Sequence, residues 1–222
     1  MAIRTNFERE LERLQDNLSA MGSMVEEALT RSVEALRRRD LEAARRVIQE
    51  DYAINAKRFA LEGDILVLIA RQQPLASDLR ILAAMLEIVT ELERIADYAK
   101  GIAKVTLLLG QEPLIKPLID IPRMAEKATD MLHRALNAFF ERDVEAARRI
   151  PYEDDEVDAL YNQVNRELLT YIMADPHNME QANYLLWVAH NLERTADRVT
   201  NLCERVIFMV TGEMKEFDAS AR

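Results

Sequence analysis

RDLEAARR at Arg39–Arg46 returns as RDVEAARR at Arg142–Arg149, with seven of the eight residues identical. LERIAD at Leu92–Asp97 returns later in the chain as LERTAD at Leu192–Asp197, with five of six identical. The members of the first pair are 103 positions apart and those of the second pair are 100 apart. Two matches in the same order at nearly the same spacing indicate an internal duplication. The difference of three residues falls between the two stretches, where we expect a loop.

Each copy is expected to form three long helices. The chain has only 5 Gly and 6 Pro and is rich in Ala, Leu, Glu and Arg, a composition typical of long helices. The predicted helices span residues 5–38, 41–71 and 77–109, then 122–142, 143–173 and 179–216. Short connections favour antiparallel neighbours, and no segment alternates like a strand. We therefore predict an all-α fold of two tandem three-helix bundles, residues 1–112 and 119–222.

Composition narrows the classes of function. The formal net charge of -10 disfavours general nucleic-acid binding, because the phosphate backbone repels an acidic protein. The single cysteine, Cys203, excludes an internal disulfide and paired-cysteine zinc sites, and it fits a reducing cytoplasm. No apolar run approaches the ~20 residues of a membrane span, and the first residues do not resemble a signal peptide. We expect a soluble cytoplasmic protein that could still dock on a membrane protein.

Pairs of polar residues four positions apart recur at matching points of the two copies and are candidate metal ligands. Residues at this spacing share one helix face. The pairs are Glu93 with Asp97, Glu193 with Asp197, Asp154 with Asp158, and Asp51 with Asn55. With Leu92 as the centre of the core face, Glu93 falls near 100° and Asp97 near 140° at about 100° per residue. The carboxylates are thus predicted on the shoulder of the bundle, where a metal ion would be open to water.

Two other interpretations of these residues remain open. The pairs could be a solvated acidic face in which Glu93 and Glu193 pair with nearby Arg or Lys. A ferritin-like di-metal oxidase is the other, but such enzymes use Glu-x-x-His pairs that point into the bundle core. His190 precedes Glu193 by three positions, which is the reverse order, and its counterpart in the first copy is Thr90. Nucleophilic catalysis has no support, since there is no G-x-S-x-G motif and no glycine-rich phosphate loop.

The segments LERIADYAKGIAK and NLERTADRVTNLCERV resemble the paired signature of the PhoU family, regulators of the phosphate-specific transport system. QQPLASDLR, from Gln72 to Arg80, is similar to the segment that opens the third helix in that family. The resemblance covers nearly the whole chain and implies a cytoplasmic, often dimeric protein that is not itself an enzyme. It implies two partners, the ATPase of the phosphate ABC transporter and a phosphate sensor histidine kinase. It also implies repression of the phosphate-starvation response when phosphate is plentiful.

The same resemblance implies metal binding at the paired acidic residues. Some family members bind multinuclear iron clusters there, and other hard cations such as manganese, magnesium or calcium suit oxygen ligands equally. By position, one site would use Asp154, Asp158, Glu193 and Asp197, and the other would use Asp51, Asn55, Glu93 and Asp97. The sequence departs from the pattern where Asn55 replaces a carboxylate and where Gly101 stands opposite Asn201. Both departures are expected to weaken the first site.

Three functions therefore compete. The regulatory adaptor has the most support, from the duplication and the family motifs. A metal-dependent enzyme would also need an open coordination position and a substrate pocket. A metal-free helical scaffold is the third, and it would use neither the acidic pairs nor the predicted partners.

Overall fold

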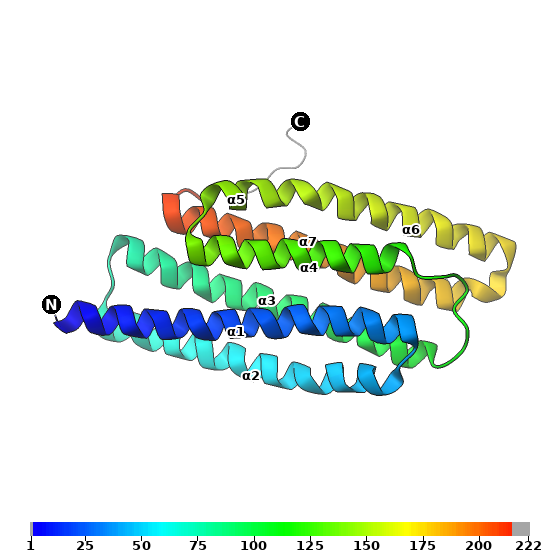
Figure 1. The fold of residues 1–222 in the computed structure, drawn as a ribbon, viewed down its shortest axis with the longest axis horizontal. Helices are drawn as coiled ribbons and strands as arrows, with labels where there is room; N and C mark the ends of the chain where they lie inside the picture. The colour runs from blue at the N-terminus through cyan, green and yellow to red at the C-terminus, as the bar shows by residue number, and fades with distance from the viewer. Residues whose placement is uncertain (1, 215–222) are drawn as a thin grey trace.

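The computed structural model describes residues 2–214, with side chains from residue 6 onward, and it confirms an all-α fold of two three-helix bundles (Figure 1). No strand occurs among these residues. The elements are α1 (Ala2–Arg38), α2 (Leu41–Gln72), α3 (Ala76–Leu109), α4 (Asp120–Glu141), α5 (Val144–Arg149), η1 (Ile150–Glu153), α6 (Asp154–Ala174), η2 (Pro176–Asn178) and α7 (Met179–Thr211). The first bundle is α1 to α3, and the second is α4 to α7.

The repeated Arg-Asp pair makes the same tight turn in each bundle. Arg39 and Arg142 both adopt the left-handed conformation, with φ of 56° and 57°. The next residue, Asp40 or Asp143, donates its N–H across the turn to Ala35 or Ala138 at 2.9 Å, and its side chain caps the following helix. This is the Schellman ending followed by an N-cap, and it reverses the chain within two residues. The repeated motif thus encodes an antiparallel helix pair.

The middle helix of the second bundle is not continuous, contrary to the prediction of one helix over residues 143–173. It is built from α5, η1 and α6, and the interruption centres on Pro151. Proline lacks the N–H of a helical hydrogen bond and its ring clashes with the carbonyl four residues earlier. The first bundle has Ile48 at this position, and α2 runs unbroken.

The last helix ends at Thr211, with Gly212 at φ 79°, so residues 212–214 are not helical. Residues 215 and 216 of its predicted span lie outside the described part.

The two bundles share one core. α3 runs antiparallel to α7 and α1 antiparallel to α4, so that the bundles join along their length (Figure 1). One continuous cluster of buried apolar side chains includes residues from both bundles. The predicted core faces are confirmed, since Ile88, Leu92, Ile95 and their counterparts Val188, Leu192 and Thr195 are all buried.

Close approach of α1 to α4 explains a glycine in the middle of a long helix. A Cβ atom at Gly22 would lie 2.5 Å from Cδ1 of Leu136. Real carbon atoms do not approach so closely, so any side chain here forces the buried Leu136 or the helices to move. The position therefore favours glycine despite its cost of about 1 kcal/mol in a helix interior.

Gly22→Val is expected to lower the free energy of unfolding by about 1–2 kcal/mol, because overpacking outweighs the gain in helix propensity. Urea unfolding followed by circular dichroism would measure it. Ser23→Val is the matched control, since Ser23 is exposed on the same turn of α1. Equal stabilities for the two variants would contradict the close packing of α1 on α4.

Candidate metal centre

The second acidic set gathers where α6 begins against the middle of α7. Asp154 and Asp158 lie on the first turns of α6, and Glu193 and Asp197 lie on α7. Burial, together with the neighbouring carboxylates of Asp158, Asp197 and Glu193, raises the pKa of Asp154 to about 7. Burial and Asp197 also raise the pKa values of Asp158 and Glu193. The four side chains are close enough to repel one another.

Two oxygens of this set have no hydrogen-bond partner among the described residues. They are Oδ1 of Asp154 and Oε2 of Glu193, and both are buried. Nδ1 of His190 lies 3.3 Å from the Glu193 oxygen, but without hydrogen-bond geometry. Buried, unpartnered carboxylate oxygens are costly. A hard cation bound by oxygen ligands would remove this cost.

The set is not arranged as a finished metal site. Among residues 2–214, no three His, Cys, Asp or Glu side chains converge in a group that could hold an ion. Asp197 pairs instead with Arg194 at 2.7 Å. Sharing one ion would require Asp197 to leave Arg194 and turn toward Asp154. The donor chemistry and the unpartnered oxygens fit a cation, while the present rotamers do not.

The first acidic set already contains its cations. Nζ of Lys100 lies 2.5 Å from Oδ2 of Asp51 and 3.9 Å from Oδ1 of Asp97. Arg58 lies 2.9 Å from Oε1 of Glu93 and forms a second pair with Glu62. The pKa of Lys100 is raised chiefly by its hydrogen bond to Asp51. The ammonium and guanidinium groups thus pair with carboxylates that the sequence assigned to a metal ion, although Oδ1 of Asp51 is buried without a hydrogen-bond partner among the described residues.

Asn55 belongs to the same network, because its Nδ2 donates to Oδ2 of Asp51 at 3.1 Å. Asp51 is only 5% exposed, so this member of the set is buried and not open to water. Asp97 is on the shoulder as predicted, with 47% of its side chain exposed. The pairing of Glu93 with an arginine agrees with the alternative interpretation of an acidic face neutralised by neighbouring cations.

The decisive residues are therefore the two that sequence reasoning passed over. Arg58 corresponds to Tyr161 at the spacing of 103, and Lys100 corresponds to Thr200 at the spacing of 100. The second set lacks both cations. The difference is visible in the sequence when the two copies are compared at the residues that surround the carboxylates, and not only at the carboxylates.

Gly101 has a role in packing that the sequence did not reveal. It lies on the face of α3 that meets α7, and a Cβ atom there would lie 3.0 Å from Nδ2 of Asn191. Close packing between the bundles explains the glycine, independently of any metal ligand.

The remaining candidates lie apart from the acidic sets. Cys203 is buried, which raises its pKa to about 12, and His133 pairs with Glu26 at 3.3 Å on the surface.

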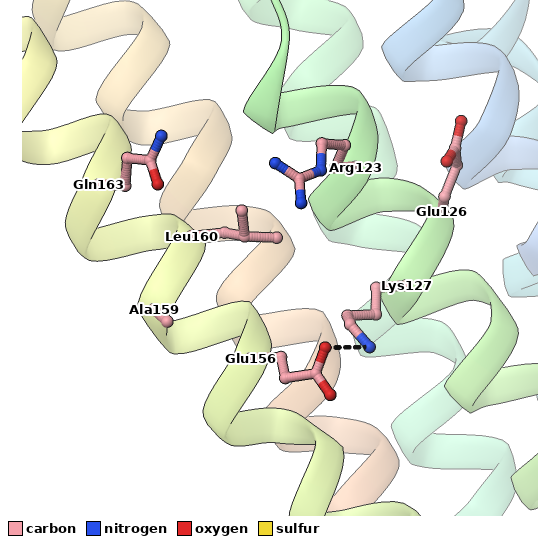
Figure 2. Close-up of a pocket in the computed structure, with 7 residues that line it drawn as sticks. All are labelled: Arg123, Glu126, Lys127, Glu156, Ala159, Leu160 and Gln163. Carbon is pink, nitrogen blue, oxygen red and sulfur yellow. Dashed lines mark ion pairs between the residues drawn. The ribbon is translucent and has the colours of Figure 1, made fainter.

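An open groove of about 530 Å³ runs between α4 and α6 (Figure 2). Its walls carry Arg123 and Lys127 from α4 and Glu156 from α6. Lys127 and Glu156 reach across it and pair at 2.7 Å. Arg123 is also paired, at 3.2 Å from Asp120. Three of the four charged residues that line the groove, Arg123, Lys127 and Glu156, are therefore paired within the chain, and Glu126 is the fourth.

Known proteins resemble this chain over nearly its whole length. The family model described as the PhoU domain matches residues 18–106 and again 121–206, which confirms the duplication. The phosphate-specific transport system accessory protein PhoU homolog of Aquifex aeolicus is 36% identical over 206 residues, 93% of each chain. The accessory protein PhoU of Escherichia coli is 34% identical over 207 residues, covering 93% of this chain and 86% of its own.

Solved structures agree with the sequence relatives. The crystal structure of the phosphate transport system regulatory protein PhoU from Streptococcus pneumoniae has a TM-score of 0.88 at 30% identity, over 95% of this chain and all of that one. PhoU from Pseudomonas aeruginosa has a TM-score of 0.87 at 33% identity, over 93% of this chain and all of that one.

Asp154→Asn is expected to stabilise the metal-free protein above pH 7 and to change little below pH 4. The folded pKa of about 7 exceeds the ordinary value of 3.8, so the stability that Asp154 contributes is lost as pH rises through 7. An amide cannot ionise, and the gain should reach about 1–2 kcal/mol at alkaline pH, given that the group is partly exposed. Urea unfolding with a chelator present, repeated across this pH range, would measure it.

The matched change in the first bundle, Asp51→Asn, is expected to have the opposite sign, because it removes the nearer of the two carboxylates that pair with Lys100. A destabilising effect of Asp154→Asn at alkaline pH would contradict the assignment of Asp154 to an uncompensated acidic cluster.

Proposed function

The chain belongs to the PhoU family, and we propose that it is an accessory protein of phosphate-specific transport that regulates phosphate uptake. The match of both copies to proteins with that role carries the proposal. In this proposal the protein restrains transport and represses the phosphate-starvation response when phosphate is plentiful. It does so through contacts with other proteins, without catalysing a reaction of its own.

The proposed partners are the ATPase of the phosphate ABC transporter and a phosphate sensor histidine kinase. An adaptor of this kind works in the cytoplasm and reaches the inner face of the membrane through its partners. No helix among the described residues is both long enough and apolar enough to span a bilayer. Two joined bundles with different surfaces suit contact with two partners. We also propose that the protein is a homodimer.

Deletion of the gene is expected to raise transcription of phosphate-starvation genes in phosphate-rich medium, measured with a reporter fusion. Affinity purification from phosphate-replete cells should recover the transporter ATPase or the sensor kinase. A chain with the core change Leu92→Asp, which should unfold the bundle, serves as the control for nonspecific capture. Unchanged reporter output after deletion, with neither partner recovered, would favour the metal-free scaffold.

We propose further that only the second acidic set binds a metal ion. Asp154, Asp158, Glu193 and Asp197 would hold it. Each set has buried unpartnered oxygens, but only the second lacks counterparts of Arg58 and Lys100, and this difference supports the proposal. Iron, in a multinuclear cluster, or a hard cation such as manganese, magnesium or calcium suits the oxygen ligands. The ion would neutralise the cluster and tie the start of α6 to α7. The ion pairs of Arg58 and Lys100 make the same connection between α2 and α3 in the first bundle.

Asp197→Asn is expected to remove most of the bound metal, whereas the counterpart Asp97→Asn should leave the metal content unchanged. Atomic absorption after exposure to iron and manganese, followed by desalting, would measure it. Thermal melts would verify that both variants fold, since neither residue belongs to the core. Equal losses from the two variants would overturn the restriction to the second set.

Exchange of the two cations provides an independent test. Arg58→Tyr with Lys100→Thr gives the first set the neighbours of the second, while keeping Asn55 in place of a carboxylate, and should increase the metal content per chain. No metal on the wild-type protein under any of these conditions would leave the acidic cluster as a surface for a partner. A metal-dependent enzyme remains the alternative function, and turnover by the metal-loaded protein would be required to support it.

A further inference from the structure

The outward face of α2 is apolar over about five turns. Tyr52, Phe59 and Leu66 lie seven positions apart and are 80%, 65% and 57% exposed. The other exposed residues between them on this face are uncharged, apart from Asp64 at its edge, which pairs with Arg13 of α1 at 3.3 Å. The face comprises Tyr52, Ala53, Ala56, Phe59, Ala60, Gly63, Leu66, Val67 and Ala70. At 1.5 Å per residue it is about 28 Å long.

The duplicated helix shows that the fold does not require this apolar face. The buried positions of α2 and α6 correspond at the spacing of 103, as Ile54 and Ile65 do with Val157 and Leu168. The outward positions of α6 are nevertheless largely polar. They are Asp155, Glu156, Ala159, Asn162, Gln163, Arg166, Leu169, Thr170 and Met173. The apolar face of α2 is thus specific to one copy, as expected for a contact surface.

Gly63 at the centre of the face is a second, independent observation. A Cβ atom at Gly63 would meet nothing within 4 Å, so no contact inside the chain requires a glycine. A glycine in a helix interior costs about 1 kcal/mol relative to alanine. Its counterpart Arg166 shows that a side chain is tolerated at this point of the bundle. The absence of a side chain allows another helix to come close.

The order of large and small residues indicates what that helix is. Along the centre of the face, Tyr52, Phe59 and Leu66 alternate with the small residues Ala56, Gly63 and Ala70. A second α2 in the same direction would place large against large. An antiparallel α2, related by a two-fold axis near residue 61, places each large residue against a small one. Phe59 then meets Gly63 of the second copy, Leu66 meets Ala56, and Tyr52 meets Ala70.

We propose that two copies of this chain pair through antiparallel contact of their α2 helices. Such a contact is isologous, since both copies use the same surface. Aromatic side chains bury roughly 150–250 Å² each, so Tyr52 and Phe59 with their neighbours supply roughly 500 Å² per copy. The total of about 1,000 Å² meets the lower limit of a specific interface. The inference rests on the proposed homodimer and names the surface through which its two copies meet. It does not depend on the proposed role in phosphate regulation.

The double variant Phe59→Asn with Gly63→Arg, which copies residues Asn162 and Arg166, is expected to be monomeric where the wild-type chain is dimeric. Sedimentation velocity over a concentration series would measure the mass. The control variant, Leu169→Gln with Met173→Gln, changes exposed apolar residues of α6 and should remain dimeric. Circular dichroism would verify that both variants are folded.

Cross-linking tests the antiparallel arrangement without disturbing the contact. Ala53→Cys and Val67→Cys place thiols at opposite ends of the face, and the native Cys203 is buried. A short bismaleimide should link the two variants when they are mixed, and neither variant to itself. Glu156→Cys with Thr170→Cys, at the matching positions of α6, should give no product.

Dimers that persist in the double variant, or cross-links formed within a single variant, would overturn the proposed surface and leave the homodimer standing. A wild-type chain that is monomeric at every concentration would overturn both. Neither result would bear on the reporter experiment, so the two failures are distinguishable.

Discussion

The antiparallel packing of α3 against α7 is the interaction on which the rest of the structure depends. The two helices cross at two equivalent points, related by the duplication. At one point Nδ2 of Asn201 donates to Oε2 of Glu91 at 3.5 Å. At the other, Gly101 faces Asn191, the counterpart of Glu91. Arg198 adds an ion pair to Glu91 at 3.5 Å. Glycine at one crossing point lets the helices approach, and the apolar faces on either side merge into one core. Each three-helix unit completes the burial of the other, which is the physical reason for a duplicated chain.

This packing leaves α2 and the α5–α6 segment on the outside, where the two copies were free to diverge. Around the acidic residues the divergence is one of charge. In the first copy Lys100 of α3 pairs with the buried Asp51 of α2, and Arg58 of α2 pairs with Glu93 of α3. The second copy has Thr200 and Tyr161 there, and burial together with neighbouring carboxylates raises the pKa of Asp154. The second copy therefore lacks the two positive side chains that pair with the carboxylates of the first copy.

On the outward surface the divergence is one of polarity. α2 presents alternating large and small apolar residues, whereas the same positions of α6 carry mainly charges and amides. The bend at Pro151 adds to the difference, because it lets α6 begin at Asp154 and directs that residue against α7. One copy of the ancestral unit is thus suited to contact with another protein surface, and the other to an ion. A symmetric core supports two unlike surfaces because the outer helices contribute only one face to it.

The sequence alone determined the helical class, the duplication and the core faces, because these follow from local periodicity and from repeated stretches such as RDLEAARR. It also located the acidic pairs, since a spacing of four places two residues on one helix face. Two features depended on tertiary structure. The ion pairs of Lys100 and Arg58 join residues 49 and 35 positions apart, a distance over which helix periodicity carries no information. The role of Gly101 depends on a residue of the other bundle. The break at Pro151 is different, because proline interrupts a helix locally and the sequence already contains that signal. Side-chain partners are set by which helix faces meet, and that is decided only when the two bundles pack.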